Sequence, residues 1–159
     1  MTGQVEFVDF TNAIDELKAI KNEEEIEILR LSAELQDYVM NAIPSFLKPG
    51  MYEYELRSHI IHLLTNQGSE EQLIMIGSAP LGQKAGHKAH FYQNRRIEAG
   101  DAVMVMLEPN GPGGLWVALG RTFILGEPDE TLQRVWDHAV KAQHYTASLL
   151  KPGATCGEI

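Results

Sequence analysis

The fold is decided by a ten-residue stretch that occurs twice. LKPGMYEYEL, residues 47–56, returns as LKPGATCGEI, residues 150–159. In both copies a helix-like segment runs into Lys-Pro-Gly, which ends a helix because proline cannot continue it and glycine supplies a positive-φ turn. Unless these are two unrelated helix terminators, the repeat predicts a duplicated fold. We expect one repeat and the opening of a second, since the second copy stops where its matching helix would begin.

Length and composition indicate a single globular domain. The chain has 159 residues, of which 44% are hydrophobic and 22% are charged. A net charge of −9 disfavours nucleic acid and anionic membrane surfaces as partners. The single cysteine, Cys156, excludes an intrachain disulfide and suits a reducing compartment. No apolar run reaches the ~18–20 residues of a membrane span and the start lacks a signal-peptide profile, so we expect a cytoplasmic protein.

Periodicity and turn signals predict an α+β pattern. Asn22 and Glu25 form a capping-box pattern that opens a long amphipathic helix ending near Phe46. The sequence Asn-Gly-Pro-Gly-Gly at residues 110–114 indicates the turn of a hairpin. We expect helices on one face of a mainly antiparallel sheet. The other predicted elements are a short strand at 5–10, helices at 12–20, 53–67 and 129–150, and strands at 72–76, 102–108 and 115–125.

The candidate reactive residues are two histidines in the polar loop GHKAHFYQNRR, residues 86–96. His87 and His90 lie between predicted strands, where scaffolds usually carry reactive groups, and a histidine can act as acid or base near neutral pH. The neighbouring Lys88, Arg95 and Arg96 favour the neutral form of these histidines. A metal site at His87-x-x-His90 would be weak with two ligands, and loop histidines without a role remain an alternative.

Further motifs follow one another along the chain: IKNEEEI at residues 20–26, NRRIEAGD at 94–101, GRTF at 120–123, and the Lys-Pro-Gly turns. Taken in this order, they resemble the catalytic domain of the Xaa-Pro aminopeptidase, prolidase and creatinase family. The resemblance implies the pita-bread fold, whose pseudo-twofold duplication agrees with the internal repeat. It also implies that residues 1–21 are a hinge after an absent N-terminal domain. Residues 22–159 would then be the first half of the catalytic domain, truncated at the start of the second repeat.

The resemblance also implies metal-ligand positions. Metallopeptidases of this family hold two metal ions, with two aspartates from this half and one histidine and two glutamates from the other. Counting back from Arg121 puts Ala118 and Leu107 at the aspartate positions, and neither can ligate a hard divalent ion. Glu108 is a weak candidate, because a shift of one residue turns a strand side chain to the other face unless a bulge restores it. We therefore expect no metal cofactor.

The segment ALGRT at residues 118–122 resembles a segment of the creatinase branch, which hydrolyses a C–N bond without metal and uses a histidine as acid and base. The spacing assigns this catalytic role to His90, with His87 as the alternative. Trp116 and Arg121 correspond to substrate-binding positions. Creatinase has tyrosine in place of Trp116 and glutamate in place of Gly120, so creatine itself is disfavoured here.

Three functions follow from the resemblance. The first is metal-independent C–N bond hydrolysis of a small amide-like or peptide substrate by the full-length protein. The second is a metal-dependent Xaa-Pro aminopeptidase or dipeptidase with a divalent metal pair. The third is a non-catalytic member that binds peptides or proteins. We expect the 159-residue chain alone to be inactive and homo-oligomeric, because half of such a fold leaves sheet edge and apolar surface uncovered.

Overall fold

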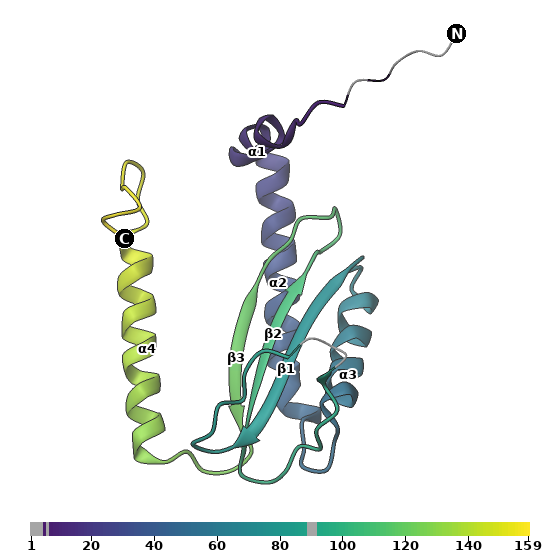
Figure 1. The fold of residues 1–159 in the computed structure, drawn as a ribbon, viewed down its shortest axis with the longest axis vertical. Coiled ribbons are helices and arrows are strands. Elements are labelled where there is room, and N and C mark those ends of the chain that lie inside the picture. The colour runs from purple at the N-terminus through teal and green to yellow at the C-terminus, as the bar shows by residue number, and fades with distance from the viewer. Residues whose placement is uncertain (1–4, 6, 89–91) are drawn as a thin grey trace.

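The structure is a computed structural model that describes residue 5, residues 7–88 and residues 92–159. From the first helix onward, the predicted order of helices and strands is confirmed, with boundaries shifted by a few residues (Figure 1). The predicted strand at residues 5–10 is wrong for its described residues, which adopt no regular structure and pair with no strand of the described chain. The elements are α1 (Thr11–Ala19), α2 (Glu23–Phe46), α3 (Glu53–Asn66), β1 (Gln72–Pro80), β2 (Asp101–Pro109), β3 (Leu119–Ile124) and α4 (Glu130–Leu149).

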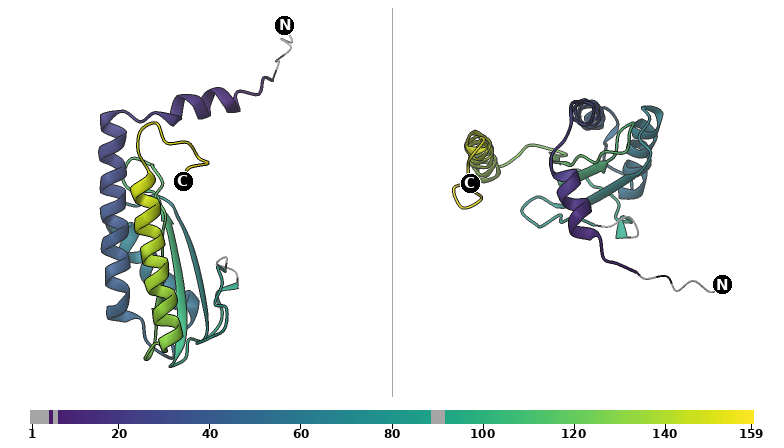
Figure 2. Two further views of the ribbon diagram at one scale, coloured as in Figure 1. Left: turned by 90° about the vertical axis from the view of Figure 1, so that its left-hand side faces the viewer. Right: turned by 90° about the horizontal axis from the view of Figure 1, so that it is seen from above.

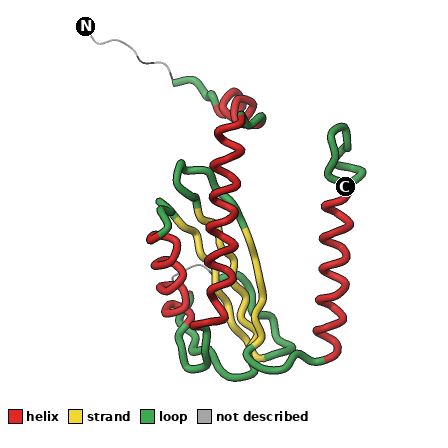
Figure 3. Tube along the Cα trace, turned by 180° about the vertical axis from the view of Figure 1, so that it is seen from behind, coloured by secondary structure: helices red, strands yellow, loops and turns green. Residues whose placement is uncertain are grey.

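The sheet is antiparallel, with strand order β1-β2-β3. Along β2, Val103, Val105 and Leu107 are fully buried, whereas the residues between them are half-buried. This alternation gives the sheet two different faces. The helix-covered face carries those three residues and packs against α2 and α3, and the open face carries Met104, Met106 and Glu108 (Figure 3).

Helix α2 begins as predicted and covers the sheet. The Asn22 side chain accepts a hydrogen bond from the Glu25 N–H at 2.9 Å, and the Glu25 carboxylate accepts from the Asn22 N–H at 2.8 Å. Further along, Val39 and Ile43 are fully buried against the sheet. Burying each such side chain contributes about 1.5–3 kcal/mol, so this stripe is a main source of stability.

The two Lys-Pro-Gly turns adopt the same conformation. Gly50 has φ +95° and Gly153 has φ +90°, a region that glycine reaches without strain. After the first turn, the Tyr52 N–H donates to the Glu55 carboxylate at 2.7 Å. After the second turn, the N–H of Thr155 donates to the carboxylate of Glu158 at 2.8 Å. The ten-residue stretch is thus repeated in its hydrogen bonding as well as in its sequence.

Helix α4 stands apart from the layer of α2 and α3. Figure 2 shows it to one side of the sheet, joined to β3 by a single connection. None of its residues is buried, and Val135, Trp136 and Tyr145 are largely exposed. None of the helices in the described chain is long and apolar enough to cross a membrane.

Candidate functional site

The loop between β1 and β2 lies against the open face of the sheet. A Cβ atom added at Gly77 of β1 would lie 2.1 Å from the Gly86 carbonyl oxygen and 2.5 Å from the Ala85 carbonyl oxygen. Only glycine allows this approach, because any side chain would collide with loop backbone. The loop therefore crosses β1 at a fixed point, and His87 is the next residue along it.

His87 lines a cleft of about 720 Å³ between the open face and α4. The floor includes Met104 of β2 and Gly120 and Thr122 of β3. In the hairpin, Met104 pairs with Thr122, and Gly120 pairs with Met106. Arg121 also lines this cleft. The wall on α4 consists of Trp136, Ala139, Val140 and Gln143.

Of the candidate residues, the structure brings His87 and Arg121 to one cleft. His90 lies outside the described residues. Trp116 follows the hairpin turn, forms an isolated bridge with Asn110 and is 48% exposed. Trp116 does not line this cleft, so the two predicted substrate-binding residues occupy different parts of the hairpin.

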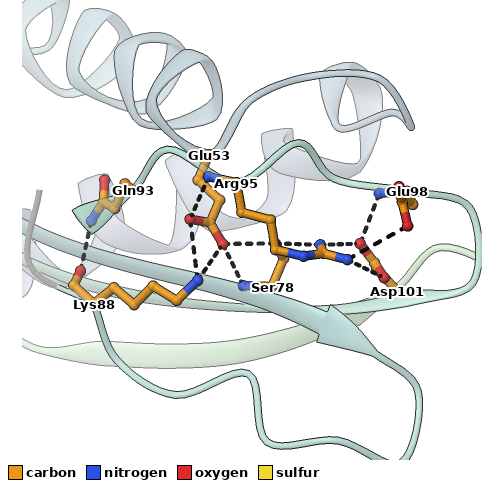
Figure 4. A network of polar contacts seen from close by, with 7 residues as sticks. All are labelled: Glu53, Ser78, Lys88, Gln93, Arg95, Glu98 and Asp101. Atoms are coloured by element: carbon orange, nitrogen blue, oxygen red, sulfur yellow. Dashed lines mark hydrogen bonds and ion pairs between the residues drawn. The ribbon is translucent and has the colours of Figure 1, made fainter. Parts of the chain in front are cut away.

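A buried carboxylate organises the polar residues next to the loop (Figure 4). Glu53, the first residue of α3, is fully buried. Its carboxylate accepts hydrogen bonds from the Ser78 N–H and hydroxyl, both at 2.7 Å, and from the Lys88 ammonium at 3.1 Å. A buried charge is stable only with such partners, so α3, β1 and the loop are tied together at this point.

A second ion pair joins the end of the loop to β2. The Arg95 guanidinium donates to both carboxylate oxygens of Asp101 and to the Ser78 hydroxyl. Burial alone raises the pKa of Asp101, but the hydrogen bonds from Arg95 and from the Glu98 N–H outweigh it and hold the pKa below its usual value. The hydrogen bond to Asp101 correspondingly raises the pKa of Arg95.

These contacts change the expected surroundings of the loop histidines. Lys88 and Arg95 are each paired with a carboxylate, and the Arg96 guanidinium donates to the Gly50 carbonyl at 3.0 Å. Two of these three cations are thus compensated by carboxylates.

Metallopeptidase family M24 matches this sequence over residues 27–159. The chain belongs to this family. The predicted resemblance is thereby confirmed, and so is the α+β, pita-bread type of fold.

Relatives support the same assignment. The probable dipeptidase PepE of Mycobacterium tuberculosis (strain ATCC 25618 / H37Rv) is 29% identical over 150 residues, which are 94% of this chain and 39% of that protein. The Xaa-Pro dipeptidase of Pyrococcus furiosus is 28% identical over 160 residues, covering 97% of this chain and 44% of that protein. The prolidase structure from Pyrococcus horikoshii OT3 has a TM-score of 0.76 at 24% identity, covers 90% of this chain and 41% of that chain, and shows the fold alone. The chain thus spans about two fifths of the length of these curated relatives.

The family's description implies a metal site, and strand direction decides which hairpin residues face it. Leu107, one of the two positions expected to hold a metal-binding aspartate, is fully buried on the helix-covered face and does not face the cleft. The pairs Leu107–Leu119 and Asn110–Trp116 follow the same register, so neither strand has a net inserted residue between them. Glu108 therefore points to the open face without one.

The donor set on this part of the M24 fold does not fit a pair of divalent ions. Continuing the register sets Ala118 opposite Glu108, beside the pair formed by Met106 and Gly120. Hard divalent ions need several oxygen ligands, and this surface offers one carboxylate. Among the described residues, no group of three or more His, Cys, Asp or Glu residues could hold a metal ion.

Sequence reasoning missed the residues that hold the loop: Glu53, Ser78, Gln93 and Asp101. The acidic first turn of α3 is ordinary for a helix, because acidic residues there favour the helix dipole. The alternating VMVMLE sequence at residues 103–108 was a usable signal for the open face, since period-two alternation fixes which side chains share a face.

Proposed function

We propose that the protein containing this chain is an M24-type hydrolase that cleaves a C–N bond without a pair of metal ions. The observation that supports this proposal is the open face of the hairpin, where Met106, Ala118 and Gly120 stand beside the single carboxylate Glu108. A hydrolase with this surface must activate water by other means. The loop histidines are the candidates.

His90 is the proposed acid and base, and His87 is the alternative. A neutral imidazole takes a proton from water as the water oxygen attacks the amide carbon. The same imidazole then gives the proton to the departing nitrogen as the C–N bond breaks. That His87 lines the cleft supports a loop histidine reaching this face of the sheet.

The proposed substrate is a small amide-like molecule or a short peptide. The dipeptidase names of the relatives support a peptide. Arg121 is among the residues that line the cleft and is exposed. It pairs with Val105, so its side chain leaves β3 on the other face, and from this edge of the sheet its guanidinium would reach an anionic group such as a carboxylate. Trp116 would contact a substrate that extends beyond this cleft to the hairpin turn.

Two alternatives have their own support. The names of the relatives favour a metal-dependent Xaa-Pro dipeptidase, in which Glu108 would be the ligand from this half. The cleft side chains Met104, Trp136 and Val140 suit the binding of an apolar peptide side chain, which favours a non-catalytic member.

Elemental analysis distinguishes the metal-dependent dipeptidase from the proposed metal-independent hydrolase. After dialysis against a weak chelator we expect no stoichiometric Mn, Co, Zn or Fe. Stoichiometric metal would refute metal independence.

The proposed catalytic role is tested in the longest form of the protein that turns over an amide or dipeptide substrate. His90→Ala should lower kcat at least about a hundredfold, because general acid–base catalysis typically contributes about 10²–10⁴-fold. His87→Ala should cost much less. Equal losses in the two variants, or none in His90→Ala, would contradict the role of His90 and favour the binding function.

We also propose that the chain forms a homodimer or a larger species in the cytoplasm. The uncovered apolar residues of α4 support association.

A further inference from the structure

The described parts of the loop between β1 and β2, residues 81–88 and 92–94, are held at three points. The first is the contact of Ala85 and Gly86 with Gly77, which fixes the loop on the open face immediately before His87. A carbonyl oxygen so close to Gly77 leaves no room for this part of the loop to sink further or to pass a side chain. The path of the chain into His87 is thus set by backbone contact.

The second point is the ion pair between Lys88 and Glu53, immediately after His87. The Lys88 side chain is 31% exposed, whereas the Glu53 side chain is fully buried, so the loop reaches inward to a buried acceptor. Glu53 keeps three other donors: the Ser78 N–H, the Ser78 hydroxyl and the Arg95 N–H at 3.4 Å. Lys88 therefore adds a link to the loop that Glu53 does not need for hydrogen bonding alone.

The third point is Gln93, which is 1% exposed. Its amide nitrogen donates to the Lys88 carbonyl at 2.8 Å and to the Ile74 carbonyl at 2.9 Å. One side chain thus joins the two ends of residues 88–93 to each other and both to β1. His90 lies between these ends in the sequence.

We infer that Lys88, through Glu53 and together with Gln93, is a positioning residue that fixes where the loop at His87 lies along β1 beside the cleft. Two of the three points directly flank His87, so this part of the loop can present the His87 imidazole to the cleft at a defined place. This inference rests on the proposed function only for the role given to the histidines. The anchoring itself is independent of any activity.

The chain offers a matched control for the test. Lys84 lies in the same loop, is exposed and has no hydrogen bond or ion pair among the described residues. Lys88→Met and Lys84→Met each remove one ammonium group from this loop and keep a side chain of similar length. Lys88→Arg keeps the charge and a donor for Glu53, and serves as the conservative rescue.

The experiment measures amide hydrogen exchange and the imidazole NMR signals of the 159-residue chain. In Lys88→Met, amides of residues 82–88 and 92–94 should exchange at least about tenfold faster, while amides of β2 keep their protection. Lys84→Met should stay within about twofold of the unchanged chain, and Lys88→Arg should restore slow exchange. The His87 ring signals should shift in Lys88→Met, whereas those of His138 and His144 on α4 should not.

Glu53→Gln separates position from charge. Lys88→Met and Glu53→Gln remove opposite charges, so a purely electrostatic effect would move the His87 signals in opposite directions. Loss of position should give faster loop exchange in both variants, and should move the signals the same way. If Glu53→Gln does not fold, the Lys88 series decides alone.

Unchanged loop exchange in Lys88→Met, or equal changes in Lys88→Met and Lys84→Met, would overturn the inference. So would faster exchange spread equally over β2, which would indicate a general structural role. None of these outcomes bears on kcat, and the His90→Ala assay does not bear on loop exchange. Failure of the proposed function and failure of the anchoring are therefore distinguishable.

Discussion

Helices α2 and α4 each end in a Leu-Lys-Pro-Gly turn, yet α2 packs against the sheet and α4 has no buried residue. Counted back from the leucine of each turn, the buried residues Leu35, Val39 and Ile43 of α2 correspond to His138, Ala142 and Thr146 of α4. No residue of α4 is buried. The shared sequence thus repeats the helix end and the turn, and does not repeat the apolar face that packs on the sheet.

An apolar stripe in the sequence of a helix does not by itself show which surface the helix packs against. Val135, Trp136 and Val140 form an apolar stripe on α4, spaced as in a packed helix. In the structure Trp136 and Val140 line a cleft, Val135 is exposed, and no residue of α4 is buried. The spacing of apolar residues identifies the face of a helix that can be buried, and only the tertiary structure shows which segment packs against that face.

The largest difference between α2 and α4 is expected when Ile43→Ala and Val135→Ala are compared for their effect on the free energy of unfolding. Ile43→Ala removes a fully buried side chain and should lower the free energy of unfolding by about 2–5 kcal/mol. Val135→Ala should change it by about 0.5 kcal/mol or less, because the site is exposed. Denaturant titration followed by circular dichroism measures both. A cost of more than 2 kcal/mol for Val135→Ala would mean that α4 is covered in solution.

Asp101→Asn tests the polar contacts on the covered side of the molecule. Loss of the charged partner of Arg95 should lower the free energy of unfolding by about 1.5–3 kcal/mol at pH 7. Because the pKa of folded Asp101 is lowered, its contribution is present above the unfolded value of about 3.9 and is lost as the pH falls through the folded value.

The curves of stability against pH for Asp101→Asn and for the unchanged chain should therefore converge in acid. A constant gap between the two curves down to pH 2 would show that charge pairing is not the cause. Urea denaturation at a series of pH values gives both curves.

Trp136→Ala tests whether the apolar stripe of α4 is an interface between copies of the chain. If a second copy covers the stripe, removing this exposed indole should weaken self-association about tenfold or more, since buried tryptophans dominate many interfaces. Sedimentation velocity at micromolar concentrations measures the change, with Tyr38→Ala on α2, also exposed, as the control. A well-behaved monomer of the unchanged chain would contradict the proposed assembly.

The helix caps should give the smallest effects. Asn22→Ala and Asp129→Ala each remove a side-chain acceptor for a first-turn N–H, at a typical cost of about 1 kcal/mol. For α2 this cost should appear in global unfolding, because α2 is part of the core. For α4 it should appear as local fraying, seen as faster exchange of the amides of residues 130–134 with no change in global stability. Equal global costs would show that the two helices unfold as one unit.

The sequence by itself determined what depends on near neighbours. The capping box of Asn22 and Glu25, the glycine turns at Gly50 and Gly153, and the helix that starts after Asp129 all follow from contacts within a few residues. Such contacts need no distant partner, so residue type and spacing suffice to predict them. The alternation of β2 belongs here too, although counting back from Arg121 selected Leu107 on the covered face.

The tertiary structure decided which surfaces meet. Nothing local distinguishes Glu53, buried under Lys88 and Ser78, from an ordinary acidic residue in a first helical turn. Gly77 is required only because loop backbone from residues 85–86 crosses it. These features arise between segments far apart in the chain, where burial and the need to pair buried charges select contacts that sequence spacing does not encode.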